Sequence, residues 1–319
     1  MIRRDALKSF AAWLAGAGLA QADAREPQGQ QPARAGESKT AARLQPPFVE
    51  AADGTRLFHR DWGLETGRPV VFLAPWAMTT DWFEYQMTYL ASQGFRCIGY
   101  DRRGHGRSDE PGRGYDFATL AADLARLIDR LDLHGITLVG HSLGAGEAVR
   151  YLSLHGPARV ARLMLIAPIT PFALKTADNP EGTERSVMEA GRERLSHDRP
   201  GQIALAAPAF FGTDVNTVAP AMLDWWTDML LEQCSLKVML DLHRMFTETD
   251  FRPDLRTITV PTLVVHGDHD KSTLLDKNGR RTAQQIAGSR LVIYEGAAHG
   301  LPITHMDRLN AELLAFANS

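Results

Sequence analysis

Near the middle of the chain, the sequence Gly140-His141-Ser142-Leu143-Gly144 lies between two segments of different character. The aliphatic and β-branched run 136–139 before it predicts a buried strand, and residues 145–155 after it predict a helix. A G-x-S-x-G motif between a strand and a helix is the pattern of a nucleophile elbow, in which a tight turn raises a serine hydroxyl above the sheet edge. Glycine permits so tight a turn. The motif therefore predicts that Ser142 is a catalytic nucleophile.

The predicted partners of this serine lie downstream. A serine hydroxyl reacts well only when a base takes its proton and a third group orients that base. On a fold with this elbow, the acid and the base follow the serine in the order Asp, His. Two apolar runs predict strands, the first followed by Asp268 and Asp270, and the second by His299. Parallel strands present their carboxyl ends at one sheet edge, so we predict His299 as the base and either Asp268 or Asp270 as the acid.

The order of the predicted elements indicates an α/β fold. Strands and helices alternate along the chain, which favours a mostly parallel eight-stranded sheet with helices on both faces. The strands are expected near residues 48–51, 56–62, 70–73, 95–100, 136–140, 160–166, 260–266 and 290–294. The helices are expected near residues 82–92, 117–131, 143–155, 276–287 and 305–317.

The alternation fails between residue 169 and about residue 253, where aromatic and methionine residues are frequent. We interpret this insert as a helical cap over the predicted active site. Most of its aromatic residues are expected to pack the cap onto the rest of the domain. Those that face the serine would favour an apolar acyl or aryl group in the substrate.

The chain from about residue 48 to its end resembles the α/β-hydrolase superfamily. Within it, the chain is similar to the bacterial branch of arylesterases and cofactor-free (non-haem) haloperoxidases. The matching stretches, beside the elbow, are residues 52–55, 84–87, 101–108, 249–251, 261–270, 299–300 and 308–316. The resemblance implies an α/β-hydrolase fold. It also implies that the second aspartate of the H-G-D-x-D stretch, Asp270, is the triad acid.

Two backbone N–H groups are expected to form an oxyanion hole. One belongs to Leu143, directly after the nucleophile. The resemblance points to Trp76 as the second donor, in a loop where the family usually has His-Gly-Trp and this chain has Ala-Pro-Trp. Many perhydrolase-like members carry proline after that tryptophan, whereas this chain has Ala77. The difference favours an esterase over a haloperoxidase.

Three functions are compatible with these patterns. The first is a serine esterase that cleaves small carboxylic or aryl esters, or lactones, through an acyl-enzyme. The second is a haloperoxidase-like perhydrolase, in which the same triad forms peracids from hydrogen peroxide. The third is a non-catalytic binding protein with a hydrolase fold, against which the complete set of Ser142, Asp270 and His299 argues.

The first residues resemble an export signal of the twin-arginine type. Arg3 and Arg4 precede an apolar run, 10–20, that is too short to span a membrane. The small-x-small sequence 22–24 then has the form of a cleavage site. We expect a signal peptide over residues 1–24, a flexible linker over 25–47 and a hydrolase domain over 48–319. The mature protein is expected to be periplasmic or secreted, with no stable membrane insertion.

Composition and the absence of other motifs narrow the expected partners. The formal net charge of −3 argues against nucleic acid as a partner. Cys97 and Cys234 are too few to form a disulfide framework. The chain has no H-E-x-x-H, C-x-x-C-H or G-x-G-x-x-G sequence, so no metal and no cofactor is expected. The predicted ligand is a small-molecule ester.

Overall fold

The computed structural model of the protein describes residues 47–319. The predicted signal peptide, and all of the predicted linker except residue 47, lie outside the described residues. In the part of the chain that is described, no helix is both long enough and apolar enough to cross a membrane.

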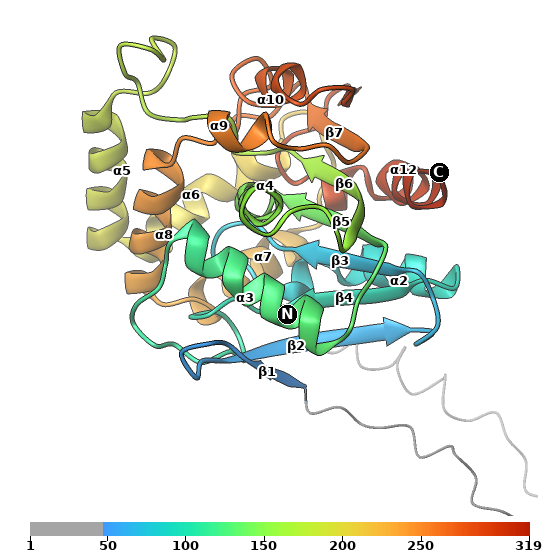
Figure 1. The fold of residues 1–319 in the computed structure, drawn as a ribbon. Coiled ribbons are helices and arrows are strands. Elements are labelled where there is room, and N and C mark those ends of the chain that lie inside the picture. The colour runs from blue at the N-terminus through green and yellow to red at the C-terminus, as the bar shows by residue number, and fades with distance from the viewer. Residues whose placement is uncertain (1–46) are drawn as a thin grey trace, which may run out of the picture. The chain divides into compact units, whose positions relative to one another are not determined.

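One eight-stranded sheet organises the domain, in the strand order β1-β2-β4-β3-β5-β6-β7-β8 (Figure 1). Strand β2 pairs antiparallel with β1 and β4, and every other neighbouring pair is parallel. The strands are β1 (Phe48–Glu50), β2 (Arg56–Gly63), β3 (Pro69–Leu73), β4 (Arg96–Tyr100), β5 (Ile136–His141), β6 (Val160–Ile166), β7 (Thr262–Gly267) and β8 (Arg290–Tyr294). The mostly parallel eight-stranded sheet predicted from the alternation is confirmed.

Burial explains the composition of the central strands. Every residue of β5 and of β7 is buried, which is why both strands are rich in aliphatic residues and lack a regular alternation of apolar and polar residues. The edge strand β8 is less deeply buried, and most of its residues are only half-buried.

Helices cover both faces of the sheet, as predicted. Helix α3 packs against α4, and α2 packs against α12. The helices of the main domain are η1 (Thr80–Phe83), α2 (Glu84–Ser92), α3 (Phe117–Arg130), α4 (Leu143–His155), α10 (Gly279–Gln285), α11 (Leu301–Thr304) and α12 (Met306–Asn318). The predicted helix 82–92 therefore begins as a short 3₁₀ turn, and the predicted helix 276–287 is shorter than expected.

The segment between β6 and β7 is helical, as predicted for the cap. Its helices are α5 (Arg185–His197), α6 (Arg199–Phe211), α7 (Pro220–Glu232), α8 (Leu236–Glu248) and the short α9 (Arg252–Leu255). In Figure 1, the arrowheads of β3, β5 and β6 point toward the side on which α5, α6 and α8 lie. The cap thus adjoins the carboxyl ends of the strands, where active sites of open α/β sheets form.

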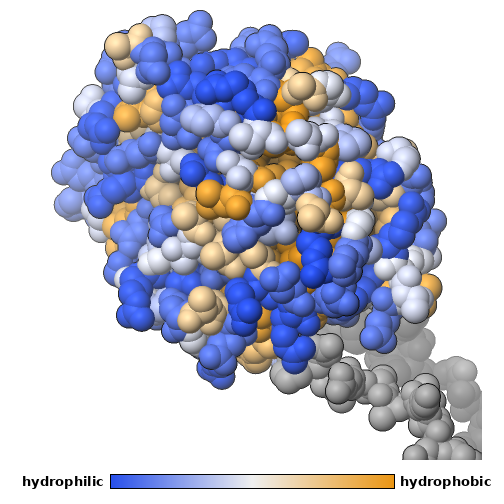
Figure 2. Space-filling view, in the orientation of Figure 1, coloured by the Kyte–Doolittle hydropathy of each residue, from blue (hydrophilic) through white to orange (hydrophobic). Residues whose placement is uncertain are grey.

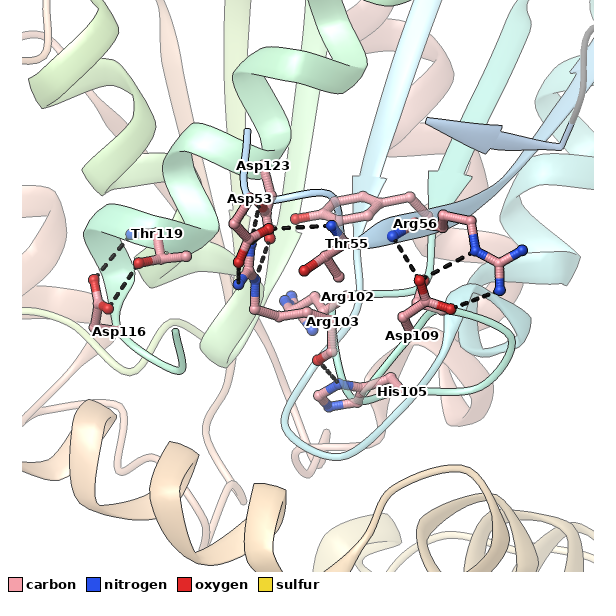
Figure 3. A network of polar contacts seen from close by, with 12 residues as sticks. Asp53, Thr55, Arg56, Arg102, Arg103, His105, Asp109, Asp116, Thr119 and Asp123 are labelled. Atoms are coloured by element: carbon pink, nitrogen blue, oxygen red, sulfur yellow. Dashed lines mark hydrogen bonds and ion pairs between the residues drawn. The ribbon is translucent and has the colours of Figure 1, made fainter. Parts of the chain in front are cut away.

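The charged turn after β4 is a structural junction. Arg103 is buried and pairs with Asp123 of α3 at 2.7 Å and with Asp53 of the loop between β1 and β2 at 3.0 Å (Figure 3). The buried carboxylate of Asp101 accepts from the backbone N–H groups of Thr80 and Arg107. These bonds fix the turn between β4 and α3.

Polar side chains cover most of the surface seen in Figure 2, and hydrophobic residues form smaller patches between them. Large apolar side chains are exposed only at scattered positions in the described residues, such as Leu205 and Val187. Scattered exposure of this kind is ordinary and indicates no docking surface by itself.

Candidate active site

Ser142 lies in the tight turn between β5 and α4, with φ of 54° and ψ of −112°. This is a left-handed conformation that a residue with a side chain rarely adopts. The turn also needs both glycines of the motif, because the chains are very close here. A Cβ atom at Gly144 would lie 2.1 Å from the carbonyl oxygen of Leu73, and one at Gly140 would lie 2.4 Å from the carbonyl oxygen of Gly144. The strained turn predicted from the motif is present.

The structure brings His299 together with Asp270. His299 Nδ1 donates to Asp270 Oδ2 at 2.7 Å, and both side chains are buried. Asp268 has another partner, since its Oδ1 accepts from the backbone N–H of Gly296 at 2.7 Å. Of the two aspartates between which the residues alone could not decide, Asp270 is the one in contact with the histidine.

Asp270 is held by its own loop as well. Its Oδ1 accepts from the backbone N–H groups of Ser272 and Thr273 at 2.8 and 2.9 Å. The hydroxyl of Thr273 donates to Oδ2 at 2.9 Å and lies 3.2 Å from His299 Nδ1. A carboxylate with this many donors has a fixed orientation, which is what the third member of a triad requires.

A second histidine contributes to this environment. His266, fully buried at the end of β7, has its Nε2 atom 3.4 Å from Asp270 Oδ2 and donates to the carbonyl oxygen of Thr273 at 2.7 Å. Burial raises the pKa of Asp270, but the neighbouring His299 and His266 outweigh it and hold that pKa well below its ordinary value. Asp270 is therefore a carboxylate at neutral pH.

Aromatic rings fix the position of the His299 imidazole. The ring of His141 lies 4.8 Å from it between centroids, and the ring of Phe210 meets it edge-on at 5.3 Å. His141 Nδ1 in turn accepts from the indole N–H of Trp82 at 3.0 Å. Burial, and then the nearby His299, hold the pKa of His141 well below its ordinary value, so His141 is neutral. His141 is thus a packing neighbour of His299.

The backbone of Leu143 begins α4, and the first N–H groups of a helix have no carbonyl partner within the helix. Both Leu143 and Trp76, the two predicted oxyanion donors, line one cavity together with Ser142 and His299. The indole N–H of Trp76 donates to the carbonyl oxygen of Met239 in the cap at 3.0 Å, which anchors this residue.

A buried arginine supports the loop that carries Trp76. The guanidinium of Arg102 donates to the carbonyl oxygen of Ala74, and to that of Pro75 at 3.3 Å. It also pairs with Glu147 of α4, which accepts from the hydroxyl of Tyr100. Arg102 therefore links the loop to the helix that follows Ser142. In the same loop, Ala77 is buried and has φ of 58°.

The cavity beside Ser142 has a volume of about 230 Å³. Its walls are mostly apolar, and the cap supplies much of them. From residues 169–253 they include Ile169, Ile203, Ala206, Phe210, Trp226, Leu230 and Phe246. Phe210, Trp226 and Phe246 are thus the aromatic residues of the insert that line the cavity beside Ser142.

Three residues of this site were not predicted as functional from the sequence. Thr273 follows Asp270 by three residues, and His266 precedes Gly267-Asp268 at the end of a predicted strand, so each had only a weak local signal. No sequence signal distinguished Arg102 from the charged residues beside it. Its role depends on contacts with Ala74, Pro75 and Glu147, which are distant in sequence.

Neither cysteine has the environment of a reactive thiol. Both are buried and free, and burial raises the pKa of Cys97 to about 12. Among residues 47–319, no three His, Cys, Asp or Glu side chains are grouped so that they could hold a metal ion.

Known proteins are similar to this chain over most of its length. Residues 68–305 match the family model described as alpha/beta hydrolase fold. The chain is 37% identical over 277 residues to a non-heme haloperoxidase of Rhodococcus erythropolis, covering 86% of this chain and all of that protein. It is 32% identical over 277 residues to a bifunctional esterase/perhydrolase of Acinetobacter calcoaceticus, covering 85% of this chain and 99% of that protein.

Solved structures agree with the sequence relatives. An esterase from Exiguobacterium antarcticum superimposes with a TM-score of 0.81 at 31% identity, and the match covers 86% of this chain and 100% of the esterase. The similarity therefore extends over the sheet, the flanking helices and the cap.

Proposed function

Because the chain belongs to the alpha/beta hydrolase fold family, we propose that it is a serine hydrolase that cleaves small carboxylic or aryl esters, or lactones, through an acyl-enzyme. One observation carries the proposal. Ser142 in its strained turn and His299 line the same cavity, and His299 is hydrogen-bonded through Nδ1 to the buried carboxylate of Asp270. The other ring nitrogen, Nε2, is thereby left to act as a base.

The first half of the reaction forms the acyl-enzyme. His299 Nε2 accepts the proton of the Ser142 hydroxyl while the serine oxygen attacks the carbonyl carbon of the ester. The carbonyl oxygen becomes an oxyanion, which the backbone N–H groups of Trp76 and Leu143 stabilise. His299 then gives its proton to the departing alcohol, the bond to that alcohol breaks, and Ser142 carries the acyl group.

The second half releases the acid. A water molecule gives a proton to His299 Nε2 and attacks the acyl carbon, and the same two N–H groups stabilise the second oxyanion. The bond to Ser142 breaks, and the serine oxygen takes the proton back from His299. Asp270 keeps its charge throughout and stabilises the imidazolium that forms twice in each cycle.

The pocket supports a preference for apolar acyl or aryl groups. A cavity of about 230 Å³ with apolar walls has room for a short chain or a single ring beside Ser142. A panel of p-nitrophenyl esters of increasing acyl length measures this preference directly. We expect kcat/KM to rise over the first few carbons and to fall once the acyl chain exceeds the cavity.

The test of the mechanism uses Ser142→Ala. This variant should fold normally and lose ester hydrolysis, because the hydroxyl serves the reaction and not the packing. A fluorophosphonate probe should label the parent protein at Ser142 and leave the variant unlabelled. If hydrolysis and labelling are unchanged in the variant, the proposal is wrong. If the parent protein hydrolyses none of the esters and is not labelled, a non-catalytic binding protein is the better description.

A perhydrolase is the second candidate, supported by the names of the related proteins from Rhodococcus erythropolis and Acinetobacter calcoaceticus. In this reaction hydrogen peroxide, in place of water, attacks the acyl-enzyme and leaves as a peracid. Both reactions share every step up to the acyl-enzyme. The ratio of peracid formed to acid formed, measured from one acyl donor at fixed peroxide, separates the two functions.

Export remains part of the proposal and rests on the sequence of residues 1–24 alone. We expect the mature protein to begin near Arg25 and to be found in the periplasm or outside the cell. Replacing Arg3 and Arg4 together by lysine should leave the precursor in the cytoplasm. Full-length protein with Met1 intact in the cytoplasmic fraction of the parent strain would contradict this.

A further inference from the structure

A second cavity of about 300 Å³ adjoins the one beside Ser142. Four residues line both cavities, namely Ile169, Phe246, Ser272 and Thr273. Thr273 is also the residue whose hydroxyl contacts Asp270. The two cavities therefore meet at these shared residues, next to the predicted triad acid.

The two cavities differ in charge. The walls of the first are mostly apolar, whereas the second is lined by three cationic side chains, Lys271, Lys277 and Arg281, and by one acidic side chain, Glu181. Lys271 is already paired, since its Nζ atom donates to Asp214 at 2.8 Å. Within residues 47–319, neither Lys277 nor Arg281 has a carboxylate within 4.0 Å.

Arg281 is held in place without being neutralised. One of its terminal nitrogens donates to the amide oxygen of Asn179 at 2.8 Å. Asn179 is buried, and its own NH₂ group donates to the carbonyl oxygens of Phe172 and Leu174 at 3.2 and 2.8 Å. A guanidinium has five N–H donors, so this single neutral contact leaves most of them for a ligand. Arg281 is therefore a fixed cation with spare donors.

We propose that the second cavity binds an anionic group of the substrate, and that Lys277 and Arg281 recognise it. The substrate class is then an ester with a carboxylate several atoms from the reacting carbonyl, such as a monoester of a dicarboxylic acid. Its apolar part occupies the cavity beside Ser142. This inference rests on the proposed function, because it concerns the substrate of the same site.

The test compares two methyl esters with acyl chains of six carbons, monomethyl adipate, whose far end is a carboxylate, and methyl hexanoate, whose far end is a methyl group. Hydrolysis is followed by proton release. The parent enzyme should show the higher kcat/KM for the anionic ester. In Lys277→Gln/Arg281→Gln, kcat/KM for the anionic ester should fall at least about tenfold more than for the neutral ester, as expected for the loss of charged hydrogen bonds. The single variant Lys277→Gln, at an exposed position, should show a smaller change in the same direction.

Arg280→Gln is the matched control. Arg280 neighbours Arg281 in α10 and pairs with Asp276 at 2.7 Å, but it does not line the second cavity. It should leave the ratio of the two kcat/KM values unchanged. If the double variant loses kcat/KM by the same factor for both esters, the ratio of the two values is unchanged and the proposal is overturned.

A binding measurement separates this inference from the proposed function. Calorimetry with Ser142→Ala and monomethyl adipate requires no turnover. Monomethyl adipate should bind to Ser142→Ala and should not bind once Lys277→Gln and Arg281→Gln are added to that variant. This result supports the anion site even if neither ester is hydrolysed. Hydrolysis of methyl hexanoate without any preference for the anionic ester supports the hydrolase and overturns the anion site.

Discussion

The Nε2 atom of His266 lies 3.4 Å from Asp270 Oδ2, the same carboxylate oxygen that accepts from His299 Nδ1. Its proton is donated to the carbonyl oxygen of Thr273, three residues after the aspartate. His266 thus fixes both ends of the short turn that carries the acid. We infer that it is a positioning residue, which acts on the reaction through Asp270 and does not touch the substrate.

The first prediction concerns this residue. His266→Leu should lower kcat by up to about tenfold and change KM little, because it removes the hydrogen bond from His266 Nε2 to the Thr273 carbonyl oxygen, and a neutral hydrogen bond is worth about 0.5–1.5 kcal/mol. His266→Gln is the control, since its amide N–H can reach the position of Nε2 and donate to Thr273. The glutamine variant should recover much of the lost kcat. Equal kcat values in the two variants would contradict a positioning role.

The second prediction separates the two aspartates. Asp270→Asn should lower kcat by roughly 10⁴-fold, because it removes the charge that orients His299 and stabilises its protonated form. Asp268→Asn loses only a carboxylate contact to the Gly296 N–H and should retain most of the activity. Steady-state kinetics on one p-nitrophenyl ester measures both. A larger loss in the Asp268 variant would reverse the assignment.

The third prediction concerns the support of the oxyanion loop by Arg102. Lysine cannot reach Ala74, Pro75 and Glu147 at once, so Arg102→Lys should lower both stability and kcat. The double variant Arg102→Met/Glu147→Leu removes both buried charges and should regain stability but not kcat. Thermal unfolding and kinetics of the two variants provide the measurement. A double variant with full kcat would show that Arg102 serves stability alone.

The fourth prediction concerns the residue after Trp76. Ala77 has φ of 58°, which the proline ring cannot adopt, so proline here must change the backbone of the oxyanion loop. Because loss of one oxyanion donor reduces kcat by about 10²–10³-fold, Ala77→Pro should reduce ester hydrolysis strongly. We also expect the ratio of peracid to acid to rise, because proline is the residue that many perhydrolase-like members of the family carry at this position. Glycine accepts positive φ, so Ala77→Gly should hydrolyse esters at close to the parent rate. Unchanged hydrolysis in the proline variant would mean that this loop does not position the donor.

The fifth prediction concerns pH and stability. Burial, and then the nearby Arg102, lower the pKa of His105 to about 3, whereas its pKa in the unfolded chain is about 6.5. Between these values the unfolded chain binds one more proton, so the free energy of unfolding falls as the pH falls, by about 1.4 kcal/mol per pH unit from this residue. His105→Asn keeps a donor for the Arg103 carbonyl and does not titrate. Denaturant unfolding at several pH values between 6 and 4 should therefore show a smaller slope in this variant.

The sequence was most informative where a function depends on a local backbone turn. Residues 140–144 predict the strained conformation of Ser142 because the glycines, the strand and the helix that produce it are neighbours in the chain. The central strands were predictable for a related reason, since both faces of a parallel strand are buried and most of its residues are therefore apolar.

The sequence was least informative where a role depends on packing between distant segments. The choice of Asp270 over Asp268 needed the family resemblance, because both lie in one loop after β7 and only the contact with His299 distinguishes them. The positive φ of Ala77 had no signal at all, since alanine rarely adopts it. Lys277 and Arg281 could not be assigned either, because their shared cavity forms only when the loop near residue 173 packs against α10.

The connection between β6 and β7 makes this architecture modular. The cap leaves the sheet after β6 and returns before β7, and it contains the wall residues Phe210, Trp226 and Phe246. Ser142, Asp270 and His299 all lie outside it. Exchange of one continuous segment, residues 169–253, between relatives would therefore transplant the cap's share of the acyl-pocket walls as a unit and leave the reacting groups on their original scaffold.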